Sequence, residues 1–391
     1  MGFDWPSAQN GSGIELGSPL VDEKGNKPPQ PRVAAQDSNV LCLGENQEPD
    51  GEVDSGSVTP DIEKGPAVGA AEDPRRRAFR ALWAKFKVWV FILLWFAFNI
   101  GYNHYNKLSL NVYRCDGTQM AWAVALWQMA FGWVIFVPMW VVGLRKAPVI
   151  NYKEALILSP SALGHLVTHV GAVVAFGLGK PSFGHIVKCA EPVVSSVLNF
   201  LLVGEVLKWP VYASLMPIIA GVGMASAGEM QFSLAMFGAA MASNLGSAGR
   251  AVYSKSVMKG GKTGENMEPA NMYAVMTVMA TMMLLPLTLL VEGPSAIATG
   301  FGETYSKHGN DFLVWMLLSG FFYYMYNEVA FMALDQLDPV SHAVTNTMKR
   351  VAVIGFMVIF AGDTFGLLGG FGSAIAITGT LLYSLAKNKF K

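Results

Sequence analysis

Four cationic side chains lie inside apolar stretches of this sequence, where charged residues are rare. They are Lys188, Arg250 and the adjacent pair Lys349 and Arg350. A cation within a membrane-crossing helix costs at least about 2.5 kcal/mol on insertion scales, so such residues usually face a bundle interior or a water-filled cavity. An arginine can hold two oxygens of a phosphate through its planar fork, and a lysine adds a compact charge on a third. These residues therefore favour the binding of a small phosphate-like anion.

Some of these cations also have a simpler interpretation. Lys188 can form an ion pair with Glu191, which lies three residues further along the same helical face. Arg250 can lie near the membrane surface and extend its guanidinium group to water. Lys349 and Arg350 have no acidic residue within four positions on their predicted helix. We therefore expect an anion from elsewhere to neutralise them.

Two polar residues are candidates for further contacts with the same anion. Tyr326 and His169 can each hydrogen-bond a phosphate or a carboxylate. Tyr326 can equally be an interface or core residue, and His169 a hydrogen-bonded histidine of the bundle. His165 and His169 have the i, i+4 spacing of some metal pairs, but no carboxylate shares that face and no HExxH motif is present. We expect neither a metal nor any other cofactor.

The composition indicates a membrane protein. Of 391 residues, 52% are apolar and 14% charged, whereas soluble domains carry about a quarter charged residues. This apolar composition predicts a lipid bilayer as the surrounding partner. The formal net charge is zero, so we expect no nucleic-acid partner. Residues 1–85 are rich in Gly, Pro, Ser and acidic residues and are predicted to be a disordered cytosolic tail.

Ten apolar stretches follow the tail, each long enough to cross about 30 Å of hydrocarbon. They are 88–105, 119–144, 155–178, 182–204, 208–228, 232–254, 271–292, 311–334, 338–361 and 366–386. The fold class is thus an all-α polytopic membrane protein with ten transmembrane helices, nine or eleven being the alternatives. With a cytosolic N-terminus, the inner loops and termini carry 16 Lys and Arg residues from residue 75 on, and the outer loops carry four. The positive-inside rule therefore predicts that both termini are cytosolic.

The second half of the membrane region aligns with the first at a constant offset of 158 residues. The matches include a proline before each fourth helix and a Gly-acid pair after it: Pro181 with Pro339, and Gly204-Glu205 with Gly362-Asp363. A five-span unit that repeats after an odd number of crossings is inverted. We therefore expect two inverted five-helix repeats, 86–229 and 230–391, the second ending in a short basic C-terminus. This overlay brings Lys188 near Lys349 and Arg350 at one central cavity.

Several motifs resemble those of the plastidic phosphate translocators, the triose-phosphate/phosphate translocator family. They are the run from Ser182 to Pro192, the pair Tyr326-Asn327, the run from Pro339 to Val344, and Lys349-Arg350-Val351. The resemblance covers about residues 85–388 and implies a ten-helix fold and strict exchange of phosphate for a phosphorylated three-, five- or six-carbon metabolite. It also implies phosphate ligands and a histidine typical of triose-phosphate carriers: Lys188, Tyr326, Lys349 and Arg350, with His169 as the histidine.

Two positions depart from the family pattern. Ala172 stands where Thr or Ser is common, and Ser247 where many members have Phe, so we expect a roomier pocket for the carbon end of the substrate. The expected function is antiport of phosphate against triose phosphate, 3-phosphoglycerate or phosphoenolpyruvate, with Arg250 as a further substrate-binding residue and no enzymatic activity. The chain is expected to be a monomer or weak dimer. A nucleotide-sugar transporter of the Golgi or endoplasmic reticulum is the alternative.

No transit peptide is recognisable before the first apolar stretch. Together with the resemblance, this predicts a plastid envelope, and specifically the outermost membrane of a complex plastid such as an apicoplast.

Overall fold

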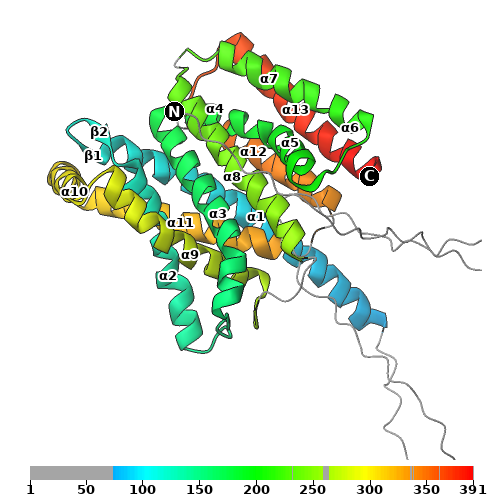
Figure 1. Cartoon of the computed structure of the whole chain (residues 1–391), viewed down its shortest axis with the longest axis horizontal. Helices are drawn as coiled ribbons and strands as arrows, with labels where there is room; N and C mark the ends of the chain where they lie inside the picture. Colours follow the sequence, from blue (N-terminus) through cyan, green and yellow to red (C-terminus); the bar gives the residue numbers. More distant parts are fainter. Residues whose placement is uncertain are drawn as a thin grey trace, which may run out of the picture. The chain divides into compact units, whose positions relative to one another are not determined.

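The computed structural model describes residues 74–230, 232–258, 264–334, 337, 339–360 and 362–390. This part of the chain is helical apart from one short antiparallel hairpin (Figure 1). In chain order, the elements are α1 (Pro74–Val112), β1 (Arg114–Cys115), β2 (Thr118–Gln119), α2 (Ala121–Val141), α3 (Tyr152–Leu178), α4 (Pro181–Val187), the 3-10 turn η1 (Lys188–Ala190), α5 (Glu191–Val203), α6 (Trp209–Ala213), α7 (Leu215–Ala227), α8 (Leu234–Met258), α9 (Pro269–Val291), α10 (Pro294–His308), α11 (Asn310–Leu334), α12 (Pro339–Phe360) and α13 (Leu367–Lys389).

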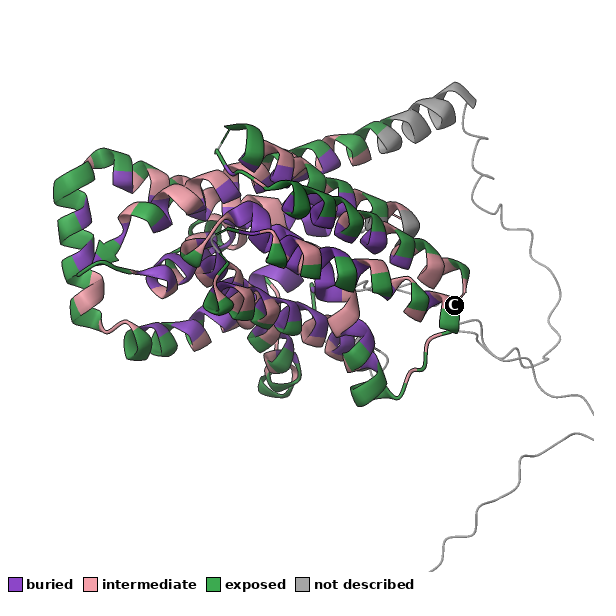
Figure 2. Ribbon diagram, turned by 90° about the horizontal axis from the view of Figure 1, so that it is seen from above, coloured by how far each residue is buried: buried purple, intermediate pink, exposed green. Residues whose placement is uncertain are grey.

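Seven segments of the described chain are long and apolar enough to cross a membrane. They are Phe86–Val112, Ala121–Val141, Tyr152–Leu178, Pro181–Val203, Trp209–Ala227, Pro269–Val291 and Leu367–Lys389. These segments fit a polytopic helical membrane protein, and apolar side chains such as Leu290 and Leu367 are exposed. Figure 2 shows exposed residues along the outer faces of the helices. Helices α8, α11 and α12 coincide with the three other predicted spans, so the number ten stays a prediction.

Helix α1 begins earlier than predicted. Pro74 is its first residue, a position that suits proline because the first helical N–H has no intrahelical acceptor. Residues 74–85 of the predicted tail are therefore helical. The rest of that prediction, residues 1–73, lies outside the described residues.

Two of the predicted spans are interrupted, and a proline accounts for each interruption. The predicted span 182–204 forms α4, η1 and α5. Pro192 has no N–H, and its ring clashes with the carbonyl group four residues earlier, which belongs to Lys188. Pro217 acts in the same way on Ala213, the last residue of α6. Both segments, Pro181–Val203 and Trp209–Ala227, are still long and apolar enough to cross a membrane, so each predicted span is present but divided.

Glycines set the closest helix contacts. The most extensive contacts join α3 with α8, α1 with α11, and α7 with α13, and Figure 1 shows the last pair side by side. A Cβ atom placed on Gly164 of α3 would lie 2.8 Å from the Cβ of Arg250, and one on Gly246 of α8 would lie 2.7 Å from the backbone nitrogen of Thr168. Only glycine permits this approach, which brings Arg250 directly against α3.

Helices α5 and α12 are followed by the same backbone turn. Gly204 and Gly362 have φ angles of 69° and 73°, a region that glycine adopts without strain. The next N–H bonds a carbonyl six residues earlier in both cases: Glu205 to Asn199 at 3.3 Å, and Asp363 to Met357 at 3.1 Å. Each pair of positions differs by 158 residues, the offset found in the sequence.

Two elements lie between the predicted spans and were not predicted. One is the hairpin of β1 and β2, and the other is helix α10. Nearby, the carboxylate of Glu292 accepts hydrogen bonds from the N–H groups of Trp122 at 2.8 Å and Ala123 at 2.9 Å. A carboxylate at a helix N-terminus satisfies otherwise unpaired donors, so Glu292 fixes the end of α9 against the start of α2.

Candidate anion-binding site

A cavity of about 180 Å³ lies among α1, α3, α8, α11, α12 and the α4–α5 segment. All six residues selected from the sequence line it: His169, Lys188, Arg250, Tyr326, Lys349 and Arg350. They come from α3, η1, α8, α11 and α12. The helix arrangement thus brings together side chains that are as much as 181 positions apart in the chain, from 169 to 350.

Arg350 forms a buried ion pair with Glu191. Its Nη2 atom lies 2.9 Å from Oε2 of Glu191, and the side chains are only 8% and 10% exposed. The first residue of α5 therefore pairs with one of the two α12 cations, and Glu191 contacts Arg350 rather than Lys188 as the alternative interpretation had it. The Arg350 Nη1 and Glu191 Oε1 atoms have no hydrogen-bond partner, so the guanidinium group retains donors for a ligand.

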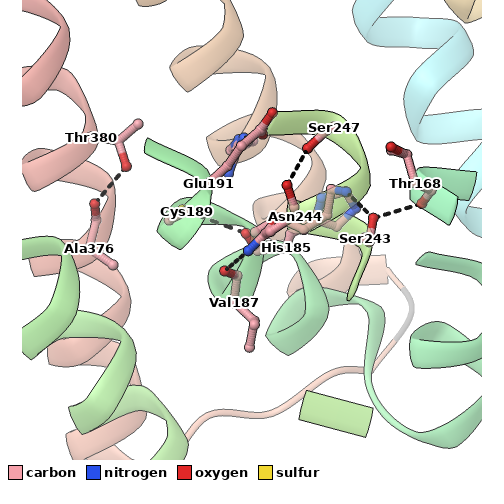
Figure 3. A network of polar contacts seen from close by, with 12 residues as sticks. Thr168, His185, Val187, Cys189, Glu191, Ser243, Asn244, Ser247, Ala376 and Thr380 are labelled. Atoms are coloured by element: carbon pink, nitrogen blue, oxygen red, sulfur yellow. Dashed lines mark hydrogen bonds and ion pairs between the residues drawn. The ribbon is translucent and has the colours of Figure 1, made fainter. Parts of the chain in front are cut away.

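Lys188 is held by helix α8. Its Nζ atom donates to Oγ of Ser243 at 2.6 Å, and that hydroxyl donates to the carbonyl of Thr168 at 2.7 Å (Figure 3). Asn244 of the same helix donates to the carbonyl of Val187 at 3.0 Å (Figure 3). These contacts fix the 3-10 turn against α8 and keep the ammonium group at the cavity.

Lys349 has an aromatic partner that the sequence did not indicate. Its Nζ atom lies 4.7 Å from the ring centroid of Trp95 in α1. The negative face of an indole ring attracts a cation but does not neutralise it. The contact therefore places the Lys349 amino group at the cavity wall.

Helices α3, α8 and α11 supply the other polar side chains. Nη1 of Arg250 lies 3.4 Å from Nδ1 of His165, so Arg250 is directed inward and not to the membrane surface. Nε2 of His165 lies 3.3 Å from the hydroxyl of Tyr323, which gives His165 two protein partners. His169 is 4% exposed and its Nε2 atom has no hydrogen-bond partner, so it is free to contact a ligand. Sequence reasoning missed Tyr323, because a tyrosine in an apolar stretch resembles packing material.

One end of α4 is tied to two other segments. The N–H and hydroxyl of Ser182 both donate to Oδ2 of Asp363, at 3.1 and 2.5 Å. Nζ of Lys180 donates to the carbonyl of Thr364 at 2.8 Å and lies 3.1 Å from Glu229. We call these five residues the α4 latch. It joins the start of α4 to the α12–α13 connection and to the residues after α7.

In this helical membrane protein, one cavity gathers four cations and one carboxylate, an arrangement that suits a small anion. The comparisons with known proteins agree with this class. The chain belongs to the Triose-phosphate Transporter family, whose sequence model matches residues 86–384.

Three relatives illustrate the range of the family. The chain is 35% identical over 303 residues to "Glucose-6-phosphate/phosphate translocator 2, chloroplastic" of Arabidopsis thaliana, covering 78% of this chain and 76% of the relative. It is 33% identical over 302 residues to "Triose phosphate/phosphate translocator, chloroplastic" of Solanum tuberosum (77% and 70%). It is 35% identical over 300 residues to "Xylulose 5-phosphate/phosphate translocator, chloroplastic" of Arabidopsis thaliana (76% and 70%). Because these identities are nearly equal, they do not rank the sugar phosphates.

Proposed function

We propose that this protein is an antiporter that exchanges inorganic phosphate for phosphorylated three-carbon metabolites: triose phosphate, 3-phosphoglycerate and phosphoenolpyruvate. The observation that carries the proposal is the meeting of Lys188, Lys349 and Arg350 at one cavity, with an Arg350 nitrogen that lacks a partner. Guanidinium and ammonium groups together match the oxygens of a phosphate dianion. The relatives are phosphate translocators by name, which supports the same ligand.

The size of the cavity favours small substrates. Its volume of about 180 Å³ is below the roughly 300–1,000 Å³ of pockets that hold drug-sized ligands. A three-carbon phosphate is compact, whereas a nucleotide sugar carries a base, two sugars and a diphosphate. Ala172 and Ser247 both line the cavity, and their small side chains leave room beside the phosphate for the carbon chain.

We propose ten transmembrane helices in two inverted repeats as the architecture. The matching turns after α5 and α12 support it, because both follow the offset of 158 residues. The main helix pairs support it as well. When each span is replaced by the corresponding span of the other repeat, the pair α1–α11 becomes the pair α8–α3. The same replacement leaves the pair α7–α13 unchanged. Inverted repeats of this kind are common in secondary transporters.

Obligatory exchange follows from the charges in the cavity. Four cations face one carboxylate there, and closing the cavity removes the water that screens them. At an effective dielectric constant of about 20, two unit charges 4 Å apart repel by roughly 4 kcal/mol. A phosphate group with a charge near −2 offsets this repulsion, so the loaded carrier closes and the empty one does so rarely. The substrate must favour the closed state for such coupling to arise.

The α4 latch supplies a gate for this cycle. Ser182 lies six residues before Lys188 on the same segment, and the latch ties this end of the segment to Asp363. With the predicted topology, the latched end faces away from the cytosol. We propose that the latch opens when the carrier takes up substrate from that side.

The test is labelled phosphate uptake into liposomes that contain the purified protein. We expect rapid uptake when the lumen holds phosphate or a three-carbon phosphate, and little uptake when it holds a neutral osmolyte. Equal uptake in both cases, or a requirement for an imposed pH gradient, would contradict exchange. Inhibition by a nucleoside monophosphate but not by excess phosphate would favour the nucleotide-sugar alternative. Glucose 6-phosphate as the preferred counter-substrate would contradict the three-carbon assignment.

We propose a plastid membrane as the location, with both termini in the cytosol. The names of the three relatives include the word chloroplastic, which supports a plastid. Assignment to the outermost membrane of an apicoplast-like plastid, and to a monomer or weak dimer, stays a prediction. Protease protection of a terminal tag in sealed organelles tests the topology, since a cytosolic tag is cleaved.

A further inference from the structure

One face of α1 forms part of the cavity wall. Trp95, Asn99 and Asn103 follow one another on this face at intervals of about one helical turn, and all three line the cavity. Asn99 is 5% exposed, so its amide group lies inside the protein and not at the membrane surface. A buried amide requires a donor for its oxygen and acceptors for the hydrogens of its nitrogen.

The contacts of Asn103 fix the orientation of two amides. Its Nδ2 atom lies 2.7 Å from the backbone carbonyl oxygen of Asn99, and a carbonyl oxygen can only accept. The nitrogen of Asn103 must therefore be on that side, and its oxygen accepts from Nε2 of His185 at 2.8 Å. The same Nδ2 atom donates to Oδ1 of Asn99 at 3.2 Å. Asn99 thus turns its oxygen toward Asn103 and its nitrogen away.

The amide nitrogen of Asn99 is left as a donor at the cavity. Within the described part of the chain, the Asn99 side chain hydrogen-bonds Asn103 alone, and that contact uses its oxygen. One turn earlier, Nε1 of Trp95 is buried and has no hydrogen-bond partner among the described residues. Both groups are N–H donors. An oxygen atom that enters the cavity beside Asn99 therefore gains a hydrogen bond.

The neighbours of Asn99 on this face place it beside the cations. The ring of Trp95 lies against Lys349, with 4.7 Å between its centroid and the Nζ atom. The residue one turn after Asn99 contacts His185, which precedes Lys188 by three positions on the α4–η1 segment. Asn99 lies between these two contacts. Its unpaired N–H groups are therefore near the part of the cavity where the cations bind phosphate.

We propose that Asn99 donates a hydrogen bond from Nδ2 to an oxygen atom of the substrate's phosphate group. A neutral donor contacts a phosphate oxygen without adding to the repulsion among the cations of the empty carrier. This inference rests on the proposed function and adds a neutral ligand on α1 to the charged ligands on η1 and α12. Because inorganic phosphate and the organic substrates share the phosphate group, Asn99 contributes to the binding of both.

The experiment measures KM for phosphate and for 3-phosphoglycerate in phosphate-loaded liposomes containing Asn99→Ala. The contact of Asn103 with the backbone carbonyl of residue 99 is retained in this variant, so the change removes the donor and leaves Asn103 in place. We expect both KM values to rise about tenfold, the effect of one lost hydrogen bond to a charged group, while their ratio keeps its wild-type value. Unchanged KM values, or a rise for 3-phosphoglycerate alone, would overturn the inference.

Asn106→Ala is the matched control. Asn106 is a buried asparagine of the same helix that does not line the cavity, and its Oδ1 atom accepts from Nε2 of Gln128 at 2.8 Å. Both KM values should stay at the wild-type level in this variant. A rise equal to that in Asn99→Ala would mean that any lost amide on α1 has this effect, which would overturn the inference.

Asn99→Asp tests the same contact with a side chain of nearly the same shape. The aspartate keeps an acceptor for Asn103 but presents a carboxylate oxygen where the wild-type protein has a donor. Because like charges placed together weaken binding strongly, we expect the KM for phosphate to rise at least 100-fold. A KM within twofold of the wild-type value would overturn the inference. Absence of phosphate exchange in the wild-type protein would instead overturn the proposed function.

Discussion

The two segments that bring cations to the cavity differ in construction. The segment of α4, η1 and α5 is interrupted at Lys188, and Glu191 follows within one turn. Helix α12 is continuous through Lys349 and Arg350 and contains no acidic residue along its length. The interrupted segment thus carries one cation and one anion, and the continuous helix carries two cations.

Because of this difference, the charged side chains form an ion pair between the two segments and not within either one. The carboxylate of the first neutralises the arginine of the second at 2.9 Å, while Lys188 is held by neutral hydroxyl and carbonyl groups through Ser243. The ion pair therefore holds the two segments together. Substitutions on the two sides should have unequal effects, and the predictions below test this inequality from the largest to the smallest.

The largest loss is expected from Arg350→Ala. It removes a phosphate ligand and also leaves the Glu191 carboxylate buried without its partner, which typically costs about 2–5 kcal/mol. Phosphate exchange in liposomes should become undetectable while membrane insertion is retained. The double variant with Glu191→Gln should recover thermal stability but not exchange. Exchange in Arg350→Ala at more than a tenth of the wild-type rate would contradict the assignment.

A smaller structural effect but a similar functional loss is expected from Lys349→Ala. Among the described residues, the polar contact given up is the one with the Trp95 ring, worth about 0.5–2 kcal/mol, so the protein should fold and insert. Because the ammonium charge is needed for the ligand, exchange should fall at least 100-fold, as expected for a lost charge-assisted contact of about 3 kcal/mol. Lys349→Arg is the control that keeps the charge. Near-normal exchange by Lys349→Ala would remove this residue from the site.

An intermediate effect is expected from Pro192→Ala, which makes the first segment resemble α12. Alanine supplies the N–H that can bond the carbonyl of Lys188 and removes the ring that prevents it. The segment should gain helical hydrogen bonding, and the Lys188 ammonium group should shift from its place at the cavity. We expect exchange to fall about tenfold, the loss that accompanies a misplaced ligand worth about 1.4 kcal/mol. Pro217→Ala, at the other proline interruption, is the matched control, and an equal loss there would contradict the explanation.

The smallest effect is expected from Asp363→Asn in the α4 latch. The amide can still accept from Ser182, but the charge assistance is lost, a difference of about 1 kcal/mol. The latched state should lose up to about fivefold in population, as corresponds to that energy. The KM for phosphate should then change on the two sides of the membrane in opposite directions. Equal changes on both sides would mean that the latch does not distinguish the two openings of the carrier.

The residues at the cavity could be selected from sequence because cations in apolar spans are rare and have few structural reasons to exist. Lys188, Lys349 and Arg350 were found in this way, and the structure gathers them. The ion pair of Arg350 could not be predicted, since its partner is 159 residues away. The interruption at Lys188 did have a signal, because Pro192 lies inside the predicted span.

Tyr323 and His165 show a different limit of sequence reasoning. An aromatic ring in an apolar stretch is usually packing material, and only the geometry of α3, α8 and α11 reveals the contacts of His165 with Arg250 and Tyr323. The same holds for the latch, in which Ser182 and Asp363 are 181 positions apart. Pairings of this kind depend on how helices dock, which local patterns do not encode.

The 3-10 turn at Lys188 has a mechanical consequence. A helix that already lacks one hydrogen bond bends at that point at little further cost, so the turn is a pivot located at the binding residue itself. Ser182 is six residues away, about 9 Å at 1.5 Å per residue, and forms the end of a lever. Tilting α4 by about 15° moves Ser182 by about 2 Å, enough to break a hydrogen bond. Lys188, at the fulcrum, hardly moves. In the exchange cycle proposed above, the latch can therefore open and close while Lys188 keeps its place at the cavity.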